Sequence, residues 1–330
     1  MSAKTGYLLT SESTDPFFNL ALEEWLLRAS PYQSCTLVYR NKPSIVMGRN
    51  QNPWLECNLD FVEANNLILT RRISGGGTVY HDLGNANFTF VMPRKQYAPR
   101  VHLKLVAEAL TKLGVQADIT DRNNLFVNRA KISGTAFMLT GKRALQHGTL
   151  LINADLQKLN QALENSLPEV DTHAVASVSD AVTNLVDIIP DISYQQFIDA
   201  IRAVLMDRTA DLKVSTLSES DFSENQDFQK YYRLQHSRNW VYGKTPAFSF
   251  YTRLPNGNSE SANYQISVKG GRINEICPEP VCPLGDTSIR QLMSFPKKQE
   301  DVSCDEDQRQ GHLSPTATQQ RAGFPENKKI

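Results

Sequence analysis

Residues 70–85 read Thr-Arg-Arg-Ile-Ser-Gly-Gly-Gly-Thr-Val-Tyr-His-Asp-Leu-Gly-Asn, and this stretch is the most informative part of the 330-residue chain. Three consecutive glycines between two strand-like runs lose chain entropy on folding and pack no side chain. They are useful where the backbone must approach a ligand closely. The preceding Arg71 and Arg72 supply planar forks for a phosphate or a carboxylate. The stretch therefore predicts an anion-binding loop, and the alternative is a loose hairpin loop between charged strands.

The glycine-rich stretch matches neither common nucleotide-binding fingerprint. No Gly-Lys-Ser/Thr follows the glycines, and their spacing differs from that of a dinucleotide-binding loop. Two later segments add polar residues on expected strands: Arg122-Asn123-Asn124 followed by Lys131-Ile-Ser-Gly-Thr-Ala, and His147-Gly-Thr-Leu. Taken alone, a lysine on a strand is usually solvated, and a histidine in an apolar strand is more often structural than catalytic.

Composition excludes several classes of protein. Lys and Arg total 35, as do Asp and Glu, and this neutral balance argues against non-specific binding to nucleic acid or membrane surfaces. A hydrophobic content of 40% with 21% charged residues is typical of a globular chain. The chain has no run of about 18 apolar residues, so no membrane-spanning helix is predicted. Five cysteines are few and odd in number, which favours a reducing compartment over a secreted disulfide scaffold.

Hydrophobic periodicity predicts an α+β fold in which strands and hairpins are interleaved with single helices. The helix over 16–29 begins at a capping Asp15 followed by Pro16. Further helices are expected over 59–65, 101–113, 156–165 and 194–207. Strands are expected over 36–40, 44–48, 67–72, 78–81, 87–92, 115–120, 125–128, 130–136, 145–153, 247–252, 264–269 and 272–277, with Gly270-Gly271 as a hairpin turn.

Four regions follow from this pattern. Residues 1–210 are expected to form a large domain with a mixed or antiparallel sheet and flanking helices, and 211–245 a helical linker. Residues 246–293 read as a second, small α+β domain, in which Cys277 and Cys282 are structural. From about 294 to 330 polar and charged residues dominate, which predicts a disordered tail.

These motifs together resemble lipoate–protein ligase A and the related mitochondrial lipoyltransferases. The matching segments are 71–85, 131–136 and 147–151, supported by 19–24, 48–54, 176–178 and 182–185. The resemblance covers about 8–205 and, more weakly, 240–279. It implies a biotin-ligase-like catalytic domain that activates lipoate with ATP to lipoyl-AMP and transfers the lipoyl group to a lysine of an acceptor domain. It also implies Mg²⁺ bound with the ATP phosphates.

The resemblance carries site residues onto this chain. The catalytic residue is Lys131, a cation between the acid and the phosphate. The nucleotide contacts are Arg72, Gly77, Thr78, Val79, Tyr80, Asn123, Asn124 and Lys131. The lipoate contacts are Arg71, Ser74, Gly75, Gly76, His81, Lys131 and His147, and a magnesium ligand is placed at Asn124.

Two departures from the family pattern keep other functions open. Relatives have Asn-Asp where this chain has Asn123-Asn124, so a carboxylate is lost, and the accessory domain ends early. Both features favour a lipoyltransferase that uses only preformed lipoyl-AMP, and a non-catalytic remnant that binds carrier domains is a third reading. No cysteine occurs between Cys57 and Cys277, which argues against octanoyltransferase relatives with a thiol nucleophile.

Partners and compartment follow from the resemblance alone. The expected acceptors are lipoyl domains of 2-oxoacid dehydrogenase E2 subunits and the glycine cleavage H protein, and the enzyme is expected to be a monomer without nucleic-acid or membrane partners. Similarity to eukaryotic members implies a mitochondrial protein. The first residues show no leader, so the cytoplasm is the alternative.

Overall fold

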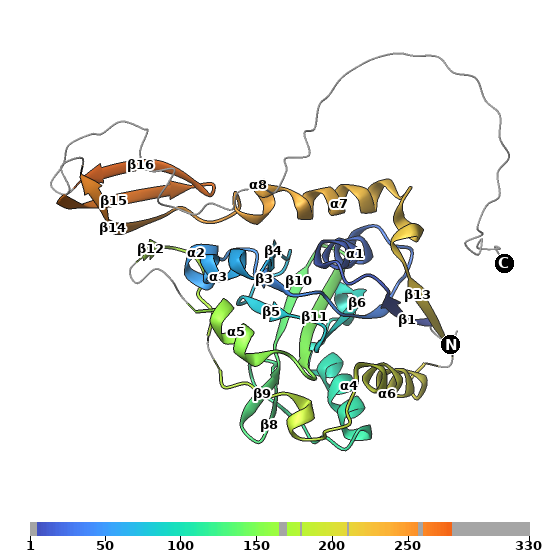
Figure 1. Ribbon diagram of the computed structural model, residues 1–330. Helices are drawn as coiled ribbons and strands as arrows, with labels where there is room; N and C mark the ends of the chain where they lie inside the picture. Colours follow the sequence, from blue (N-terminus) through green and yellow to red (C-terminus); the bar gives the residue numbers. More distant parts are fainter. Residues whose placement is uncertain (1–4, 165–169, 179, 210, 257–259, 279–330) are drawn as a thin grey trace, which may run out of the picture. The chain divides into compact units, whose positions relative to one another are not determined.

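A computed structural model of the chain describes residues 5–164, 170–178, 180–209, 211–256 and 260–278 (Figure 1). These residues belong to one compact unit. The expected tail over 294–330, the end of the expected accessory domain and Cys282 lie outside the described residues. Within them, no helix has the length and hydropathy needed to cross a lipid bilayer.

The main sheet of the described chain has six strands, and it is mixed, which is one of the two arrangements that the sequence predicts. Its strands, in spatial order, are β10 (Thr135–Leu139), β11 (Arg143–Leu151), β6 (Asn85–Pro93), β2 (Cys35–Tyr39), β1 (Thr5–Ser11) and β13 (Asp211–Leu217). The pairs β1–β2 and β1–β13 are parallel and the others antiparallel. In β6, alternation sends Phe88 and Phe90 into one core and Val91 into the opposite one, so both faces of the sheet are covered.

Two pairs of helices cover these faces (Figure 1). Helices α4 (Pro99–Lys112) and α6 (Tyr194–Met206) pack together on one side, and α1 (Pro16–Arg28) and α7 (Gln226–His236) on the other. The predicted start of α1 is confirmed, because the Asp15 side chain accepts a hydrogen bond from the N–H of Phe17 and Pro16 occupies the first turn.

A three-stranded sheet holds the glycine-rich loop, which spans residues 72–78. Its strands are β4 (Ile68–Arg71), β3 (Ser44–Met47) and β5 (Val79–His81), with β3 in the middle. The loop therefore crosses from one side of β3 to the other, and the hairpin alternative is wrong. A second small sheet contains β7 (Asp118–Ile119), β8 (Leu125–Val127) and β9 (Ala130–Ser133). The remaining short helices of the main part are α2 (Pro53–Glu56), α3 (Leu59–Ala64), α5 (Leu156–Ala162), η1 (Arg94–Gln96), η2 (Leu185–Asp187) and η3 (Glu219–Phe222).

Three local predictions need correction. The strand expected over 115–120 is reduced to the two residues of β7, and the single strand expected over 130–136 breaks at Gly134 into β9 and β10, which belong to different sheets. The linker expected from 211 begins inside the main sheet, because β13 pairs with β1 from Thr5–Asp211 to Ser11–Leu217. The catalytic part thus extends past the predicted boundary.

The C-terminal part forms a four-stranded antiparallel sheet after α8 (Arg238–Val241). Its order is β12 (Val170–Thr172), β14 (Phe248–Asn256), β15 (Glu260–Lys269) and β16 (Arg272–Pro278). The predicted turn between β15 and β16 is confirmed, with positive φ at Gly270 and Gly271. Because β12 comes from the preceding catalytic segment, the two parts share a sheet, and Trp54 packs against Phe248 in a common apolar core.

Candidate active site

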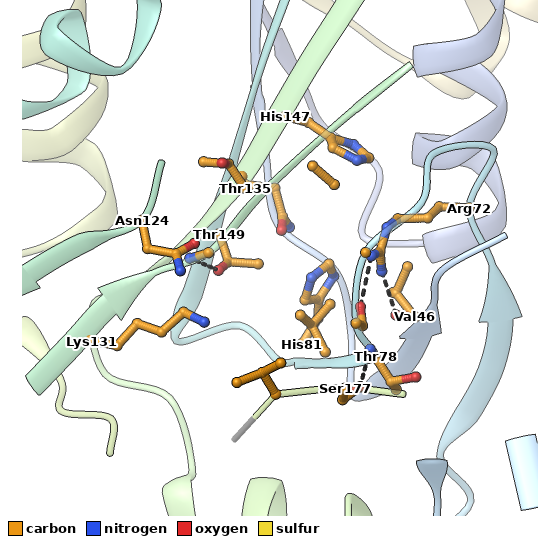
Figure 2. A pocket seen from close by; sticks show the side chains of 18 of the residues that line it. Val46, Arg72, Thr78, His81, Asn124, Lys131, Thr135, His147, Thr149 and Ser177 are labelled. Carbon is orange, nitrogen blue, oxygen red and sulfur yellow. Dashed lines mark hydrogen bonds between the residues drawn. The ribbon is translucent and has the colours of Figure 1, made fainter. Parts of the chain in front are cut away.

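A cavity of about 340 Å³ opens beside the glycine-rich loop (Figure 2). Its walls come from the loop and β5, from residues of β9, β10 and β11, and from residues 175–178 and Asp180. A second cavity of about 520 Å³ adjoins it and shares Thr78, Lys131 and Asp180 among its lining residues. Both volumes are in the range of small-molecule sites.

The glycine-rich loop owes its path to close contacts that a side chain would block. Gly76 has a φ of +85°, and a Cβ there would lie 3.1 Å from Nη2 of Arg72. A Cβ on Gly48 would lie 2.0 Å from the Gly76 carbonyl oxygen, and one on Gly77 would lie 2.9 Å from Oγ of Ser177. Gly75 differs, since a Cβ there meets nothing within 4 Å. Gly76 and Gly77, which line the cavity, are therefore required for the loop to follow this path.

Arg72 holds this loop in place. Its guanidinium donates to the carbonyl oxygens of Val46 (2.9 Å), Gly75 (2.7 Å) and Gly77 (2.7 Å), and its Nε donates to Oγ of Ser74 at 3.0 Å. Burial lowers the pKa of Arg72 to about 10, which leaves it protonated at neutral pH. Arg72 lines the cavity, so its positive charge faces any anion bound there.

The expected contact between Arg71 and lipoate does not fit the position of this residue. The Arg71 side chain is fully buried and lines neither cavity. It donates instead to backbone carbonyls of the 48–51 loop and of α8, and to Oγ1 of Thr245. Neighbouring residues of an extended chain point to opposite sides, so only one of the two arginines can face the cavity. Arg71 therefore stabilises the fold by joining β4 to the 48–51 loop and to α8 through hydrogen bonds.

Lys131 reaches the region that the two cavities share. Its Nζ lies 2.9 Å from Oδ2 of Asp180, and both side chains are partly exposed, at 21% and 26%. Asn124 lines the first cavity near Lys131, on the side opposite Arg72 in Figure 2. Asn123 lines neither cavity; its carbonyl accepts a hydrogen bond from Thr135, so a nucleotide contact from its side chain is not supported, and the adjacent Arg122 lines the first cavity instead.

Ser74, His147 and Glu23 form a buried polar chain at the far end of the first cavity. Nε2 of His147 lies 2.7 Å from Oγ of Ser74, and Nδ1 of His147 lies 2.8 Å from Oε2 of Glu23. The oxygen of Ser74 accepts from Nε of Arg72, and because the Glu23 carboxylate can only accept, Nδ1 of His147 donates to it. His147 lines the cavity, whereas Ser74 lies behind it with no exposed surface.

A strap of residues 175–178 closes one side of both cavities. Oγ of Ser177 donates to the Glu56 carboxylate on α2, and the N–H of Thr78 donates to Ser177 Oγ at 2.9 Å. Gln51 adds a bond from its Nε2 to Ser177 at 3.0 Å. The strap is thus fastened to the glycine-rich loop and to α2.

Most residues that the sequence nominates do meet here. Those lining the first cavity are Arg72, Gly76, Gly77, Thr78, Val79, His81, Asn124, Lys131 and His147, and Tyr80 lines the second. Gly75 and Ser74 belong to the loop but line neither cavity. Asp180 has no signal in the sequence, and Arg122 stands there only in the polar 122–124 segment without a predicted role, yet both line the first cavity. Ser177, Gln51 and Glu23, which support the site, were not predicted as site residues either. The segments 19–24, 48–54 and 176–178 matched the family pattern in the sequence, but no residue type or spacing within them indicates a chemical role.

Comparison with known proteins places the chain in a family. Residues 15–206 match the lipoyl protein ligase A/B catalytic domain. A protein named lipoate-protein ligase A from Psychrobacter cryohalolentis is 38% identical over 278 residues, which are 82% of this chain and 81% of that protein. The crystal structure of P. falciparum LipL1 in complex with lipoate has a TM-score of 0.65 and 27% identity, covering 83% of this chain and 84% of that one.

A crystal structure of lipoate-protein ligase A bound with ATP has the same fold, with a TM-score of 0.58 and 22% identity over 73% of this chain and 98% of that one. The predicted α+β catalytic fold is confirmed by these similarities. The family match covers more than half of the chain, and the curated relative matches most of its length. This chain therefore belongs to the lipoyl protein ligase A/B catalytic-domain family.

Proposed function

We propose that the protein is a lipoate–protein ligase that activates lipoate with ATP and transfers the lipoyl group to a lysine of an acceptor domain. The observation that carries this proposal is the position of Lys131, a cationic side chain that lines both cavities. The first cavity has buried apolar walls, including Leu20 and Val46, that suit the acyl chain and its dithiolane. The second suits the nucleotide. The names of the relative and of the ligand-bound structures support the same pairing.

The chemistry requires two anions to meet. In the first step a lipoate carboxylate oxygen bonds to the α-phosphorus of ATP, and pyrophosphate leaves. In the second step the amine of the acceptor lysine bonds to the acyl carbon, AMP leaves, and the nitrogen loses a proton. Lys131 would neutralise the carboxylate and the phosphate in the first step and stabilise the leaving phosphate in the second. Arg72 keeps a further positive charge on the cavity wall.

The residues present fit Mg²⁺ that is held mainly by the ATP phosphates. The described chain has no group of three or more His, Cys, Asp or Glu side chains arranged to hold a metal ion. Asp180 lines both cavities and Asn124 lines the first one beside Lys131, where the cavities meet; one or two such protein oxygens plus phosphates are typical of Mg²⁺. When bound, Mg²⁺ would offset phosphate charge during activation.

A mass-spectrometric assay tests the proposed function. An acceptor lipoyl domain is incubated with the protein and either lipoate plus ATP or preformed lipoyl-AMP, and its mass is measured. Modification under both conditions is the expected result. Modification with lipoyl-AMP alone would make the protein a transferase, the candidate that the neutral Asn124 favours. An acceptor whose mass stays unchanged under both conditions would refute the proposal, and binding of carrier domains without catalysis would be the remaining candidate function.

We expect Asn124→Asp to raise the rate with lipoate plus ATP several-fold and to leave the lipoyl-AMP rate unchanged. The added carboxylate supplies charge to Mg²⁺ at the phosphates, which matter only while pyrophosphate is expelled. Both rates are measured in both proteins. Equal ATP-dependent rates would show that residue 124 does not limit activation, whereas an equal gain with lipoyl-AMP would contradict the metal-linked explanation.

Substitution of Gly76 should block the ligand without unfolding the protein. In Gly76→Val the side chain would press on Arg72 and Ala136 and strain a backbone of positive φ, so lipoyl-AMP binding should weaken about tenfold or more. Titration calorimetry measures the affinity, and thermal unfolding checks the fold. Gly75→Ala is the matched control, because its Cβ meets open space. Tight binding by folded Gly76→Val would make the loop purely structural.

The acceptors we propose are lipoyl domains of 2-oxoacid dehydrogenase E2 subunits and the glycine cleavage H protein, with the enzyme acting as a monomer. We also propose the mitochondrion as the compartment, on the resemblance to eukaryotic members. Offering each acceptor separately in the same assay ranks them, and fractionation of cells that express the full-length natural gene tests the compartment.

A further inference from the structure

His81 lines the first cavity and carries a buried hydrogen-bonding atom that no described residue uses. Its ring is 3% exposed and lines the first cavity but not the second. Nε2 has no hydrogen-bond partner within the described chain, whereas Nδ1 lies 3.0 Å from Nδ2 of Asn41. Figure 2 shows the ring between Lys131 and Arg72. A buried polar atom without a partner at a ligand cavity indicates a contact that the ligand completes.

Two buried amides determine which nitrogen of His81 carries the proton. Nδ2 of Asn19 donates to the carbonyl oxygens of Ser13 at 2.8 Å and Arg40 at 3.1 Å, and a carbonyl oxygen can only accept. The same Nδ2 also lies 2.9 Å from Oδ1 of Asn41, so its two N–H groups are shared among three acceptors. Asn41 must therefore turn its amide nitrogen toward His81. Both asparagine side chains are fully buried, so no solvent competes for these bonds.

The order of donors along this chain, from Asn19 through Asn41 to His81, leaves Nδ1 as an acceptor. The proton of a neutral imidazole then sits on Nε2 and points at the ligand. The surroundings of the ring agree with a neutral state. Burial first, and the positive charge of Arg72 next, lower the pKa of His81 to about 3.

We propose that Asn19 and Asn41 are positioning residues that fix His81 as a neutral Nε2–H donor to the acyl carbonyl oxygen of the bound lipoyl group. The inference rests on the proposed function. The dithiolane and methylene chain of lipoate have no strong hydrogen-bond acceptor, so the carboxyl oxygens are what this part of the ligand can offer to Nε2. A neutral donor stabilises the oxyanion that develops during acyl transfer and does not transfer a proton to it.

The isosteric change Asn41→Asp tests this inference, because a carboxylate can only accept at Nδ1. The proton must then move to Nδ1, or the ring must become a cation. NMR of ¹⁵N-histidine-labelled, ligand-free protein reads the tautomer directly, and His81→Gln identifies the His81 signals. We expect a protonated Nε2 and an unprotonated Nδ1 in the wild type, and a protonated Nδ1 in Asn41→Asp.

Transfer from preformed lipoyl-AMP supplies the second measurement. We expect Asn41→Asp to lower kcat about 100-fold with little change in KM for the acceptor. His81→Leu should lose as much, while His81→Gln, whose amide can still donate, should recover most of the rate. Asn52→Asp is the matched control: Asn52 is also fully buried, and its Oδ1 accepts from the N–H of Trp54, as a carboxylate would. It should leave the tautomer and the rate unchanged.

Several results would overturn the proposal. One is a wild-type His81 with its proton on Nδ1, which can be observed even if the Asn41 variant does not fold. Another is wild-type transfer by His81→Leu, or by an Asn41→Asp protein whose tautomer has changed. An equal loss in Asn52→Asp would assign the effect to a buried charge. A wild-type protein that lipoylates nothing from either donor is a distinct outcome, because it refutes the proposed function itself.

Discussion

Lys131→Ala is expected to reduce acceptor lipoylation about 10²–10³-fold, which corresponds to about 3–4 kcal/mol of lost transition-state stabilisation. The lysine is the cation at the junction of the two cavities, where the acid and the phosphate would meet. Its stem is partly exposed and its charged partner is the partly exposed Asp180, so the fold should tolerate the change. Single-turnover rates with lipoate plus ATP and with lipoyl-AMP measure the loss in each step.

Lys112→Ala is the matched control for this substitution, because Lys112 is paired with Asp207 at 3.3 Å on the surface and lines neither cavity. It should retain the wild-type rate, as expected for a surface ion pair. Lys131→Arg keeps the charge but spreads it over a planar group, and it should fall between the wild type and alanine. Near wild-type turnover by Lys131→Ala would remove this residue from the mechanism.

Local sequence signals predicted the elements whose structure is decided locally. The helix that begins at Asp15 has both a cap and a proline in its first turn, and β6 alternates apolar residues toward two cores. Strands β1 and β13 were missed because their pairing joins residues 206 positions apart. In β13 the side chains from Asp211 to Thr216 are partly or fully exposed, so no buried stripe distinguishes this strand from a polar linker.

The candidate site also contains features that the local sequence indicates and features that only the fold determines. The glycine-rich loop could be found because three glycines are rare outside positions where a side chain would collide, as at Gly76 and Gly77. Its two arginines could not be told apart by chemistry, since only the fold decides which one faces the cavity. Asp180 had no detectable signal, because a single carboxylate in a polar stretch gains its meaning only from the Nζ atom of Lys131 at 2.9 Å.

The two neighbouring arginines should therefore behave differently when each is replaced. Arg71→Ala is expected to lower the free energy of unfolding by about 3–5 kcal/mol, because it leaves several buried carbonyls without donors at roughly 1–3 kcal/mol each before relaxation. These are the carbonyls of Gly48, Gln51 and Val241, at 3.2, 2.8 and 2.9 Å from the guanidinium. Urea unfolding measures the effect as a lower midpoint with an unchanged slope.

The control is Arg100→Ala, which removes an exposed arginine paired with Asp121 and should change stability by less than about 1 kcal/mol. Arg71→Lys should be intermediate, because one ammonium cannot reach acceptors on both the 48–51 loop and α8. If Arg71→Ala were as stable as the wild type but failed to bind lipoyl-AMP, the original assignment of Arg71 to the ligand would be right. Loss of stability in Arg71→Ala, with lipoyl-AMP affinity retained under conditions where the variant is folded, would instead establish that the first arginine of the pair holds the scaffold while the second faces the ligand.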